Sequence, residues 1–318
     1  MRTKNKEIRV FAPATVSNIA CGFDIMGFAI DMPGDELVLR VSEKPGVRIV
    51  KITGDNGRLT YNPEFNTGGK PVLSMIKAFG IDCGVEIEIH KQMPLGSGLG
   101  SSAASAVAAA FAMNKLFELN LSESELLPFA IEGEMIASGS LHADNVAPAL
   151  YGGFVLIRSY HPIDIIKLDV PKELFCSVIH PHIEISTKEA RELLPEQIPL
   201  STAIRQWGNT AALVAGLLKS DFALIGRSLE DFVAEPVRSR LIPGFAQMKQ
   251  AALDAGAIGC SISGSGPSLF ALSDSRDRAD KIAKSMQMAL NTFNLGSDLY
   301  VSAVNTQGPR ILNCQTFV

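Results

Sequence analysis

The sequence predicts an α/β protein of mixed, α+β character with two domains. The first third of the chain reads mainly as strands, and strand-like and helix-like segments alternate in the second half, a pattern typical of sheets covered by helices. The 318 residues are 47% hydrophobic, which suffices for a large core and, by length, for two domains. The pattern restarts after about residue 165. We therefore expect one domain over residues 1–165 and a second over 166–318.

The first domain is expected to consist mainly of strands before its helices begin. Runs of β-branched or alternating residues between turn signals predict strands at 8–12, 36–41, 47–52, 85–90 and 154–158. Residues 14–30 mix polar residues and glycines with apolar ones and fit neither period, so we expect an ordered loop there. Its polar groups either satisfy the local backbone or line a substrate site.

A glycine-rich stretch follows the strand expected at 85–90 and precedes a run, 102–119, that is apolar nearly all round and predicts a buried helix. It reads Pro94-Leu95-Gly96-Ser97-Gly98-Leu99-Gly100-Ser101-Ser102-Ala103-Ala104. Alternate glycines allow a tight turn that brings backbone N–H groups close to a ligand, and the helix start adds its positive dipole end. The G-x-G-x-G spacing without a following Lys-Ser/Thr pair excludes the G-x-x-x-x-G-K-[ST] loop and disfavours a dinucleotide fold. The stretch predicts a phosphate site.

A second helix is expected over 122–139. Ser122 and Glu125 have the spacing of a capping box. At about 100° per residue, Glu134 falls on the apolar stripe of this helix and Glu132 about 200° away. A carboxylate that faces a core needs a cation, which is either a basic side chain or a magnesium ion.

The second half of the chain predicts a compact α/β sandwich. Strands are expected at 174–180, 258–263, 268–272 and 299–304. Helices are expected at 202–218, 222–233, 245–255 and 279–291.

Composition excludes several classes of protein. A net charge of −4 without a long basic run argues against nucleic acid as a partner. The five scattered cysteines include no C-x-x-C pair, so we expect reduced thiols, without a zinc site or a disulfide framework. The polar N-terminus is unlike a signal peptide, and the longest apolar stretch is too short for a bilayer. We expect a soluble cytoplasmic protein with no membrane partner.

Three motifs, in this order, resemble those of the GHMP kinase superfamily. Residues 12–24, APATVSNIACGFD, are similar to its N-terminal motif, and residues 94–104 to its central P-x-x-x-G-L-G-S-S-A-A motif. Residues 259–268, GCSISGSGPS, resemble its C-terminal glycine motif. The resemblance covers nearly the whole chain, with only residues 308–318 matching poorly.

Within the superfamily, further details resemble the homoserine kinases. These are HADNVAPA at 142–149, TKEAR at 187–191 and EPVR at 235–238. The resemblance implies an N-terminal ribosomal-protein-S5-like domain with the phosphate loop, and a C-terminal ferredoxin-like domain. It implies transfer of phosphate from ATP, with Mg²⁺, to the hydroxyl of L-homoserine in threonine biosynthesis, by a homodimer. Another GHMP small-alcohol kinase, such as a mevalonate-type kinase, and a non-catalytic ligand sensor on the same fold remain the alternatives.

The resemblance also implies site residues. The nucleotide would contact Asn66, Lys91 and all of Pro94 to Ala104, and magnesium would bind Ser102 and Glu134. Homoserine would bind Asn18, Asp24, His142, Arg191 and Arg238, with Arg240 as the alternative to Arg238. In catalysis, Asn145 would contact the reacting hydroxyl, Asp144 would be secondary as a general base, and Thr187 would stabilise phosphate charge.

Overall fold

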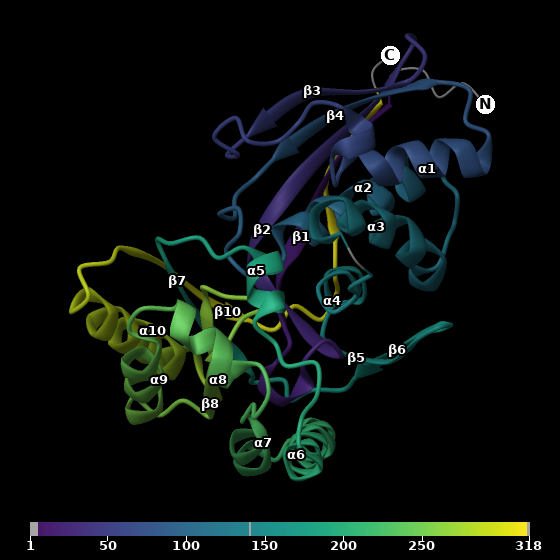
Figure 1. The fold of residues 1–318 in the computed structure, drawn as a ribbon. Coiled ribbons are helices and arrows are strands. Elements are labelled where there is room, and N and C mark those ends of the chain that lie inside the picture. Colours follow the sequence, from purple (N-terminus) through teal and green to yellow (C-terminus); the bar gives the residue numbers. More distant parts are fainter. Residues whose placement is uncertain (1–5, 140, 317–318) are drawn as a thin grey trace.

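The computed structural model describes residues 6–139 and 141–316, and within them the strands form two sheets (Figure 1). Helices cover one face of each sheet, and the remaining face of the second sheet packs against the first domain. The predicted mixed α/β architecture is confirmed.

The first sheet has the strand order β11-β1-β2-β4-β3, and β5 pairs with both β2 and β6. Only the β3–β4 pair is parallel among the described strands. The strands are β1 (Lys6–Ser17), β2 (Met26–Ser42), β3 (Val47–Thr53), β4 (Gly84–His90), β5 (Phe154–Tyr160), β6 (Ile163–Leu168) and β11 (Arg310–Thr316).

The expectation of an ordered loop over 14–30 is wrong for most of that stretch. Ser17 pairs with Gly27, so β1 and β2 form one long hairpin that contains these residues. The register shifts between Pro13 and Ala14, and an irregularity of this kind redirects a strand. Residues 14–17 and 26–30 are buried throughout, so no alternation of apolar and polar residues marks them as strands in the sequence. Within the stretch 14–30, the part outside the strands is the hairpin tip, residues 18–25.

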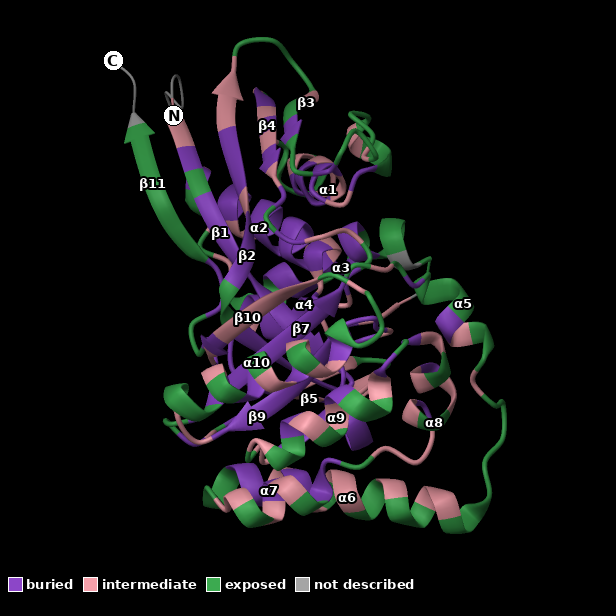
Figure 2. Ribbon diagram, turned by 90° about the vertical axis from the view of Figure 1, so that its left-hand side faces the viewer, coloured by how far each residue is buried: buried purple, intermediate pink, exposed green. Residues whose placement is uncertain are grey.

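The last strand was not expected from the sequence. β11 pairs antiparallel with β1, so this strand lies in the first sheet although it follows the expected division at residue 165. It is an edge strand and largely exposed, as its green colour in Figure 2 shows. Because it buries little, it carries no pattern of alternating burial that would predict a strand.

The helices of the first domain position the glycine-rich stretch. They are α1 (Gly69–Phe79), α2 (Ser101–Leu116), α3 (Glu123–Ser138) and α4 (Val146–Tyr151), with short 3₁₀ turns η1 (Ala20–Gly22) and η2 (Pro63–Phe65). Helix α2 is buried nearly all round, as predicted, and packs on β1, β2 and α3. The capping box of Ser122 and Glu125 starts α3. On this helix Glu134 is buried and Glu132 is exposed, also as predicted.

The second sheet has the order β10-β7-β9-β8, all antiparallel. Its strands are β7 (Phe175–Pro181), β8 (Gly259–Ile262), β9 (Leu269–Ser273) and β10 (Ser297–Ala303). Helices α9 (Phe245–Asp254) and α10 (Arg276–Asn291) cover one face of it. This strand–helix–strand–strand–helix–strand order is the ferredoxin-like arrangement that was expected.

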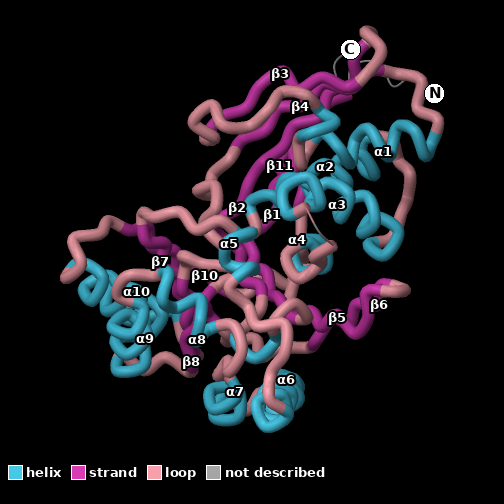
Figure 3. The backbone as a smooth tube through the Cα atoms, in the orientation of Figure 1, coloured by secondary structure: helices cyan, strands magenta, loops and turns pink. Residues whose placement is uncertain are grey.

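The connection from β7 to α9 holds the remaining helices, drawn in cyan in Figure 3. They are α5 (Thr187–Glu192), α6 (Leu200–Lys219), α7 (Phe222–Ser228), α8 (Glu235–Arg238) and the 3₁₀ turn η3 (Ser239–Leu241). The helix expected over 222–233 therefore ends at Ser228. Asp231 accounts for the difference, because its carboxylate binds the N–H groups of the following residues and holds a turn. None of the described helices has the length and apolarity needed to cross a bilayer.

The two domains share a core. Phe28 of β2 stacks on Phe154 of β5, with ring centroids 4.4 Å apart, and meets Phe270 of β9 edge-on at 5.9 Å. All three rings are fully buried. Apolar packing between the sheets therefore holds the two domains together.

Candidate active site

A pocket of about 440 Å³ lies where the two domains meet, beside the start of α2. The first domain contributes the tip of the β1–β2 hairpin, the glycine-rich stretch and residues 142–145. The second contributes α5, α8 and the turn between β8 and β9. All three motifs of the sequence thus meet at one site.

The glycine-rich stretch is clamped by the β8–β9 turn. Ser263 donates a hydrogen bond to the carbonyl of Gly98 (2.7 Å), and Ser268 donates one to the carbonyl of Ser97 (2.6 Å). Gly98 has a φ of +77°, and a Cβ there would lie 2.5 Å from the carbonyl oxygen of Ser263. Only glycine fits this close approach. The loop from one domain is therefore fixed on the other.

The loop is built to receive an anion. The hydroxyl of Ser97 is buried, lines the pocket and has no hydrogen-bond partner among the described residues. Gly100 precedes α2 in the left-handed conformation and gives the helix no side-chain cap. The unsatisfied N–H groups of the first turn and the positive dipole end suit a phosphate. The residues present thus fit the triphosphate of ATP.

Lys91, which was expected near the adenosine, is engaged inside the protein. Its ammonium forms a buried ion pair with Asp35 and donates to the carbonyl of Ser101 (2.6 Å) and the hydroxyl of Ser105 (2.8 Å). This network fastens the first turn of α2 to the sheet. Asn66 is engaged with the turn before α1 and is not among the described residues that line the pocket.

Ser102 and Glu134, expected as the magnesium ligands, lie together at the pocket. The hydroxyl of Ser102 donates to a carboxylate oxygen of Glu134 at 3.0 Å. Burial raises the pKa of Glu134 to about 7, and the nearby charge of Asp144 adds to the rise. Within the described residues, no cluster of three His, Cys, Asp or Glu side chains could hold a metal ion. One hydroxyl and one carboxylate nevertheless fit Mg²⁺, which usually takes its other ligands from phosphate and water.

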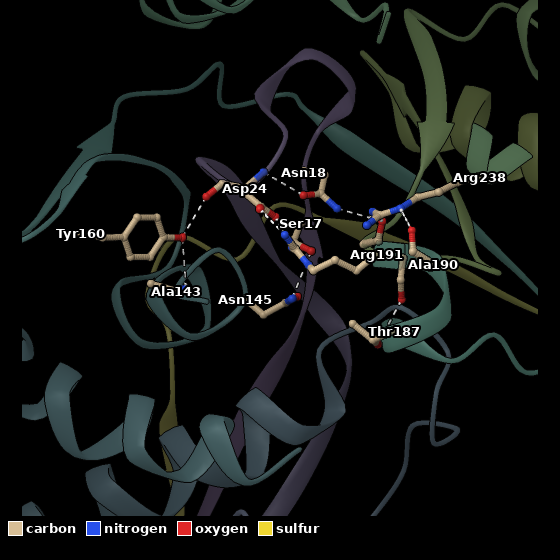
Figure 4. A network of polar contacts seen from close by, with 12 residues as sticks. Ser17, Asn18, Asp24, Ala143, Asn145, Tyr160, Thr187, Ala190, Arg191 and Arg238 are labelled. Atoms are coloured by element: carbon tan, nitrogen blue, oxygen red, sulfur yellow. Dashed lines mark hydrogen bonds and ion pairs between the residues drawn. The ribbon is translucent and has the colours of Figure 1, made fainter. Parts of the chain in front are cut away.

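Asp24 and Arg191 form the centre of the other end of the pocket (Figure 4). The guanidinium donates two hydrogen bonds to the carboxylate, at 2.9 and 2.8 Å. Hydrogen bonding to Asp24 raises the pKa of Arg191. The Nε of Arg191 is buried without a hydrogen-bond partner among the described residues. This N–H can therefore donate a hydrogen bond to a ligand in the pocket.

Arg238 and Asn18 complete this end. Arg238 donates to the carbonyls of Ala190 (3.3 Å) and Gly264 (3.1 Å), and burial lowers its pKa. Asn18 also donates to Gly264 (2.8 Å) and accepts from the backbone N–H of Asp24 (3.0 Å). Arg240, the alternative, is exposed and is not among the described residues that line the pocket.

The 142–145 run connects the two ends of the pocket. Burial and the charge of Asp24 raise the pKa of Asp144 to about 6. His142 also lines the pocket, and burial lowers its pKa. The amide of Asn145 accepts from Thr15 (2.7 Å) and donates to Ser17 (3.0 Å). Thr187 lines the opposite wall, 3.3 Å from the hydroxyl of Ser265.

Several residues of the site could not be found from the sequence. Tyr160 donates to the carbonyl of Asp24 (2.8 Å) and accepts from Ala143 (3.4 Å), which joins the hairpin tip to the 142–145 run. Burial raises its pKa. Ser17 lies inside the N-terminal motif, so the sequence offered a signal for it. Tyr160 lies outside every motif, so the sequence offered no signal that it belongs to the site.

Comparisons with known proteins agree with this geometry. Residues 70–153 match the family model for the N-terminal domain of GHMP kinases, and residues 213–291 match that for the C-terminal domain. A homoserine kinase of Chlorobium phaeovibrioides is 53% identical, over 96% of this chain and 100% of its own. A crystal structure of homoserine kinase from Cytophaga hutchinsonii shares 59% identity and a TM-score of 0.94, covering 96% of this chain and 97% of the other. A mevalonate kinase from L. major, 19% identical with a TM-score of 0.73 over 95% of this chain and 98% of the other, shares the fold.

Proposed function

Because this chain belongs to the homoserine kinases within the GHMP kinase family, we propose that it transfers the γ-phosphoryl group of ATP to the side-chain hydroxyl of L-homoserine. The observation that carries this proposal is the Asp24–Arg191 pair, which faces the same pocket as the glycine-rich stretch. The end of the pocket at the glycine-rich stretch suits phosphate, and the end at the Asp24–Arg191 pair suits a small zwitterion.

The charges of this pair complement an amino acid. The carboxylate of Asp24 would receive the ammonium group of homoserine, and the guanidinium of Arg191 its carboxylate. Arg238 lies beside Arg191 and would share the carboxylate. Binding would then replace the Asp24–Arg191 contacts with contacts to substrate, and the buried Nε of Arg191 is a further donor.

The nucleotide end supports ATP as the phosphoryl donor. The triphosphate would lie on the stretch from Pro94 to Ala104, where the hydroxyl of Ser97 has no hydrogen-bond partner among the described residues. Ser102 and Glu134 would hold Mg²⁺, which supplies neutralisation of phosphate charge when bound. Asn66 and Lys91 would act near the adenosine by shaping the turn before α1 and the start of α2.

Phosphoryl transfer depends mainly on positioning. Asn145 would orient the acceptor hydroxyl, since an amide keeps one N–H and one lone pair beyond its contacts with Thr15 and Ser17. Asp144 would be secondary and mainly contribute charge beside the ammonium. The hydroxyl of Thr187 would contact the transferred phosphate. His142 and Asn18 would complete the polar lining around homoserine.

A coupled assay of ADP release tests this function against its alternatives. We expect turnover with L-homoserine and none with mevalonate, which lacks an ammonium group for Asp24. Turnover with mevalonate alone would favour the other kinase class. Binding of homoserine without ADP release from any small alcohol would favour a ligand sensor, against which the Ser102–Glu134 pair argues.

We also propose a homodimer, which the outer face of α6 supports. Its apolar positions follow the heptad spacing of a helix–helix seam, at Leu200, Ile204, Trp207, Ala211, Val214 and Leu218. Most are open to solvent, with Leu200 at 68%, Ile204 at 51% and Trp207 at 56% exposure. The positions directly beside the seam are uncharged, so two copies of this face would meet without repulsion; they are Ser201, Ala203, Gly208, Thr210, Ala215 and Leu217.

Cytoplasmic residence is a further part of the proposal. The scatter of the five cysteines along the sequence, without a C-x-x-C pair, supports it, because reduced thiols are typical of that compartment.

A further inference from the structure

Arg58 and Glu184 form an ion pair that joins the two domains at the pocket. Nη2 of Arg58 lies 2.7 Å from one carboxylate oxygen of Glu184, and Nη1 lies 3.1 Å from the other. Both residues line the pocket, and each side chain is 52% exposed. Arg58 lies between β3 and η2, and Glu184 between β7 and α5.

The carboxylate of Glu184 lies directly on the phosphate loop. A Cβ built on Gly96 would lie 2.9 Å from Glu184 Cγ and 3.0 Å from its Oε1. A polyphosphate on this loop therefore comes close to a carboxylate, and two anions at such range repel each other. The repulsion must be relieved by a cation or by movement of Glu184.

Arg58 is the cation best placed to relieve it. Among the described residues that line the pocket, the cationic ones are Arg58, Lys91, Lys188, Arg191 and Arg238. Lys91 is buried against Asp35, and the two other arginines belong to the Asp24 end. Lys188 is 85% exposed and faces Glu192 along its own helix.

The backbone of Arg58 is held in place, whereas its side chain is half-exposed. The buried carboxylate of Asp55 accepts from the N–H of Leu59 (3.1 Å), and the carbonyl of Asp55 accepts from the N–H of Arg58 (3.2 Å). Gly54 packs this turn on the backbone of Lys91, next to the phosphate loop.

We propose that Arg58 is a nucleotide-binding residue whose guanidinium exchanges Glu184 for the phosphates of ATP. Its planar fork suits a phosphate as well as a carboxylate. In the exchange, Glu184 keeps Arg58 oriented at the pocket before nucleotide binds and is displaced when it does. This inference depends on the proposed kinase function, because it assumes a polyphosphate on the loop.

Nucleotide affinity of matched variants tests the exchange, with calorimetric titration of ADP and of a non-hydrolysable ATP analogue as probes. For Arg58→Gln we expect affinity to fall about tenfold, the size of one lost charge-assisted hydrogen bond. Adenosine affinity and the KM for homoserine should not change. Arg58→Lys should give an intermediate loss, since it keeps the charge without the fork.

Glu184→Gln distinguishes exchange from simple bracing of the domains. Without the competing carboxylate, nucleotide should bind as tightly as in the parent or more tightly. If Arg58→Gln and Glu184→Gln weakened nucleotide binding equally, the proposal would be overturned. A purely structural ion pair between the domains is lost when either partner is removed. Unchanged ADP affinity in Arg58→Gln would overturn it as well.

Arg158→Gln is the matched control. Arg158 pairs with Asp164 on the exposed β5–β6 hairpin, and neither residue lines the pocket in the described structure. Its nucleotide affinity should equal that of the parent. A parent protein that binds no ATP would refute the proposed function together with this inference. A parent that phosphorylates homoserine, with Arg58→Gln unaltered, would refute the inference alone.

Discussion

Arg191 binds Asp24 through two parallel hydrogen bonds across 167 residues of sequence. The pair presents one positive and one negative group at the same point of the pocket, as the two ends of an amino acid require. Under the proposed function, the carboxylate of Asp24 occupies the place on Arg191 that the substrate carboxylate would take, so substrate affinity would depend on how easily the two residues separate.

Arg191→Met should lower kcat/KM for homoserine by about 100-fold or more, because two charge-assisted bonds of about 1.5–3 kcal/mol each are lost. The KM for ATP should stay close to that of the parent. Arg240→Gln is the control, since Arg240 is exposed and not among the described pocket residues. Steady-state kinetics with each substrate varied in turn measures both. A loss confined to ATP would contradict the assignment.

Glu134→Gln should remove a pH dependence of stability in the metal-free protein. A carboxyl whose pKa is raised from 4.5 to about 7 binds more protons when folded, so the parent loses stability as pH rises through this window. The loss is about 3 kcal/mol at most. Urea unfolding in EDTA between pH 5 and 7.5 measures it. Added Mg²⁺ with ADP should restore the parent at pH 7.5 and leave Glu134→Gln unchanged.

Substitutions of Asp144 and Asn145, the two residues that precede α4, should have different effects on kcat and KM. Asn145→Ala should lower kcat about 100-fold through lost orientation of the hydroxyl. Asp144→Asn should keep most of kcat and raise the KM for homoserine. In the parent, homoserine affinity should weaken as pH falls through about 6, where Asp144 protonates, and Asp144→Asn should lack this trend. If Asp144→Asn abolished kcat with KM unchanged, Asp144 would be the general base.

Gly98→Ala should abolish nucleotide binding, with Gly80→Ala at the end of α1 as its control. Both glycines are left-handed, at φ +77° and +60°, so each alanine carries a similar backbone strain of about 1–2 kcal/mol. Of the two, Gly98 is the one where the new Cβ would meet backbone, whereas Gly80 has open space around it. Titration with ADP compares the two. Equal affinities would show that the clamp on the loop is not needed for binding.

Ile204→Asp should break the proposed homodimer into monomers. A charge at the centre of the α6 seam would be buried without a partner in the dimer. Sedimentation velocity should show the loss, and the fluorescence of Trp207, the single tryptophan, should shift to the red. Met288→Asp on α10, at a position 64% exposed, should leave the dimer intact. A parent that sediments as a monomer would refute the proposal.

The sequence by itself determined the local features of this protein. The burial of α2, the capping box of α3 and the inward direction of Glu134 each follow from neighbours within one or two helical turns. The glycine spacing likewise predicted the anion site, because backbone freedom is a property of those residues themselves.

Only the tertiary structure decided which residues meet across the chain. The β1–β2 hairpin through residues 14–30 and the return of β11 to β1 depend on pairing partners far away in sequence. The same holds for the ion pair of Lys91 with Asp35 and for that of Arg58 with Glu184. Long-range ion pairs and edge strands leave no local period, because their stabilising partner is elsewhere. The motifs therefore predicted which stretches of the chain meet at the pocket, and folding decided how its charges are paired.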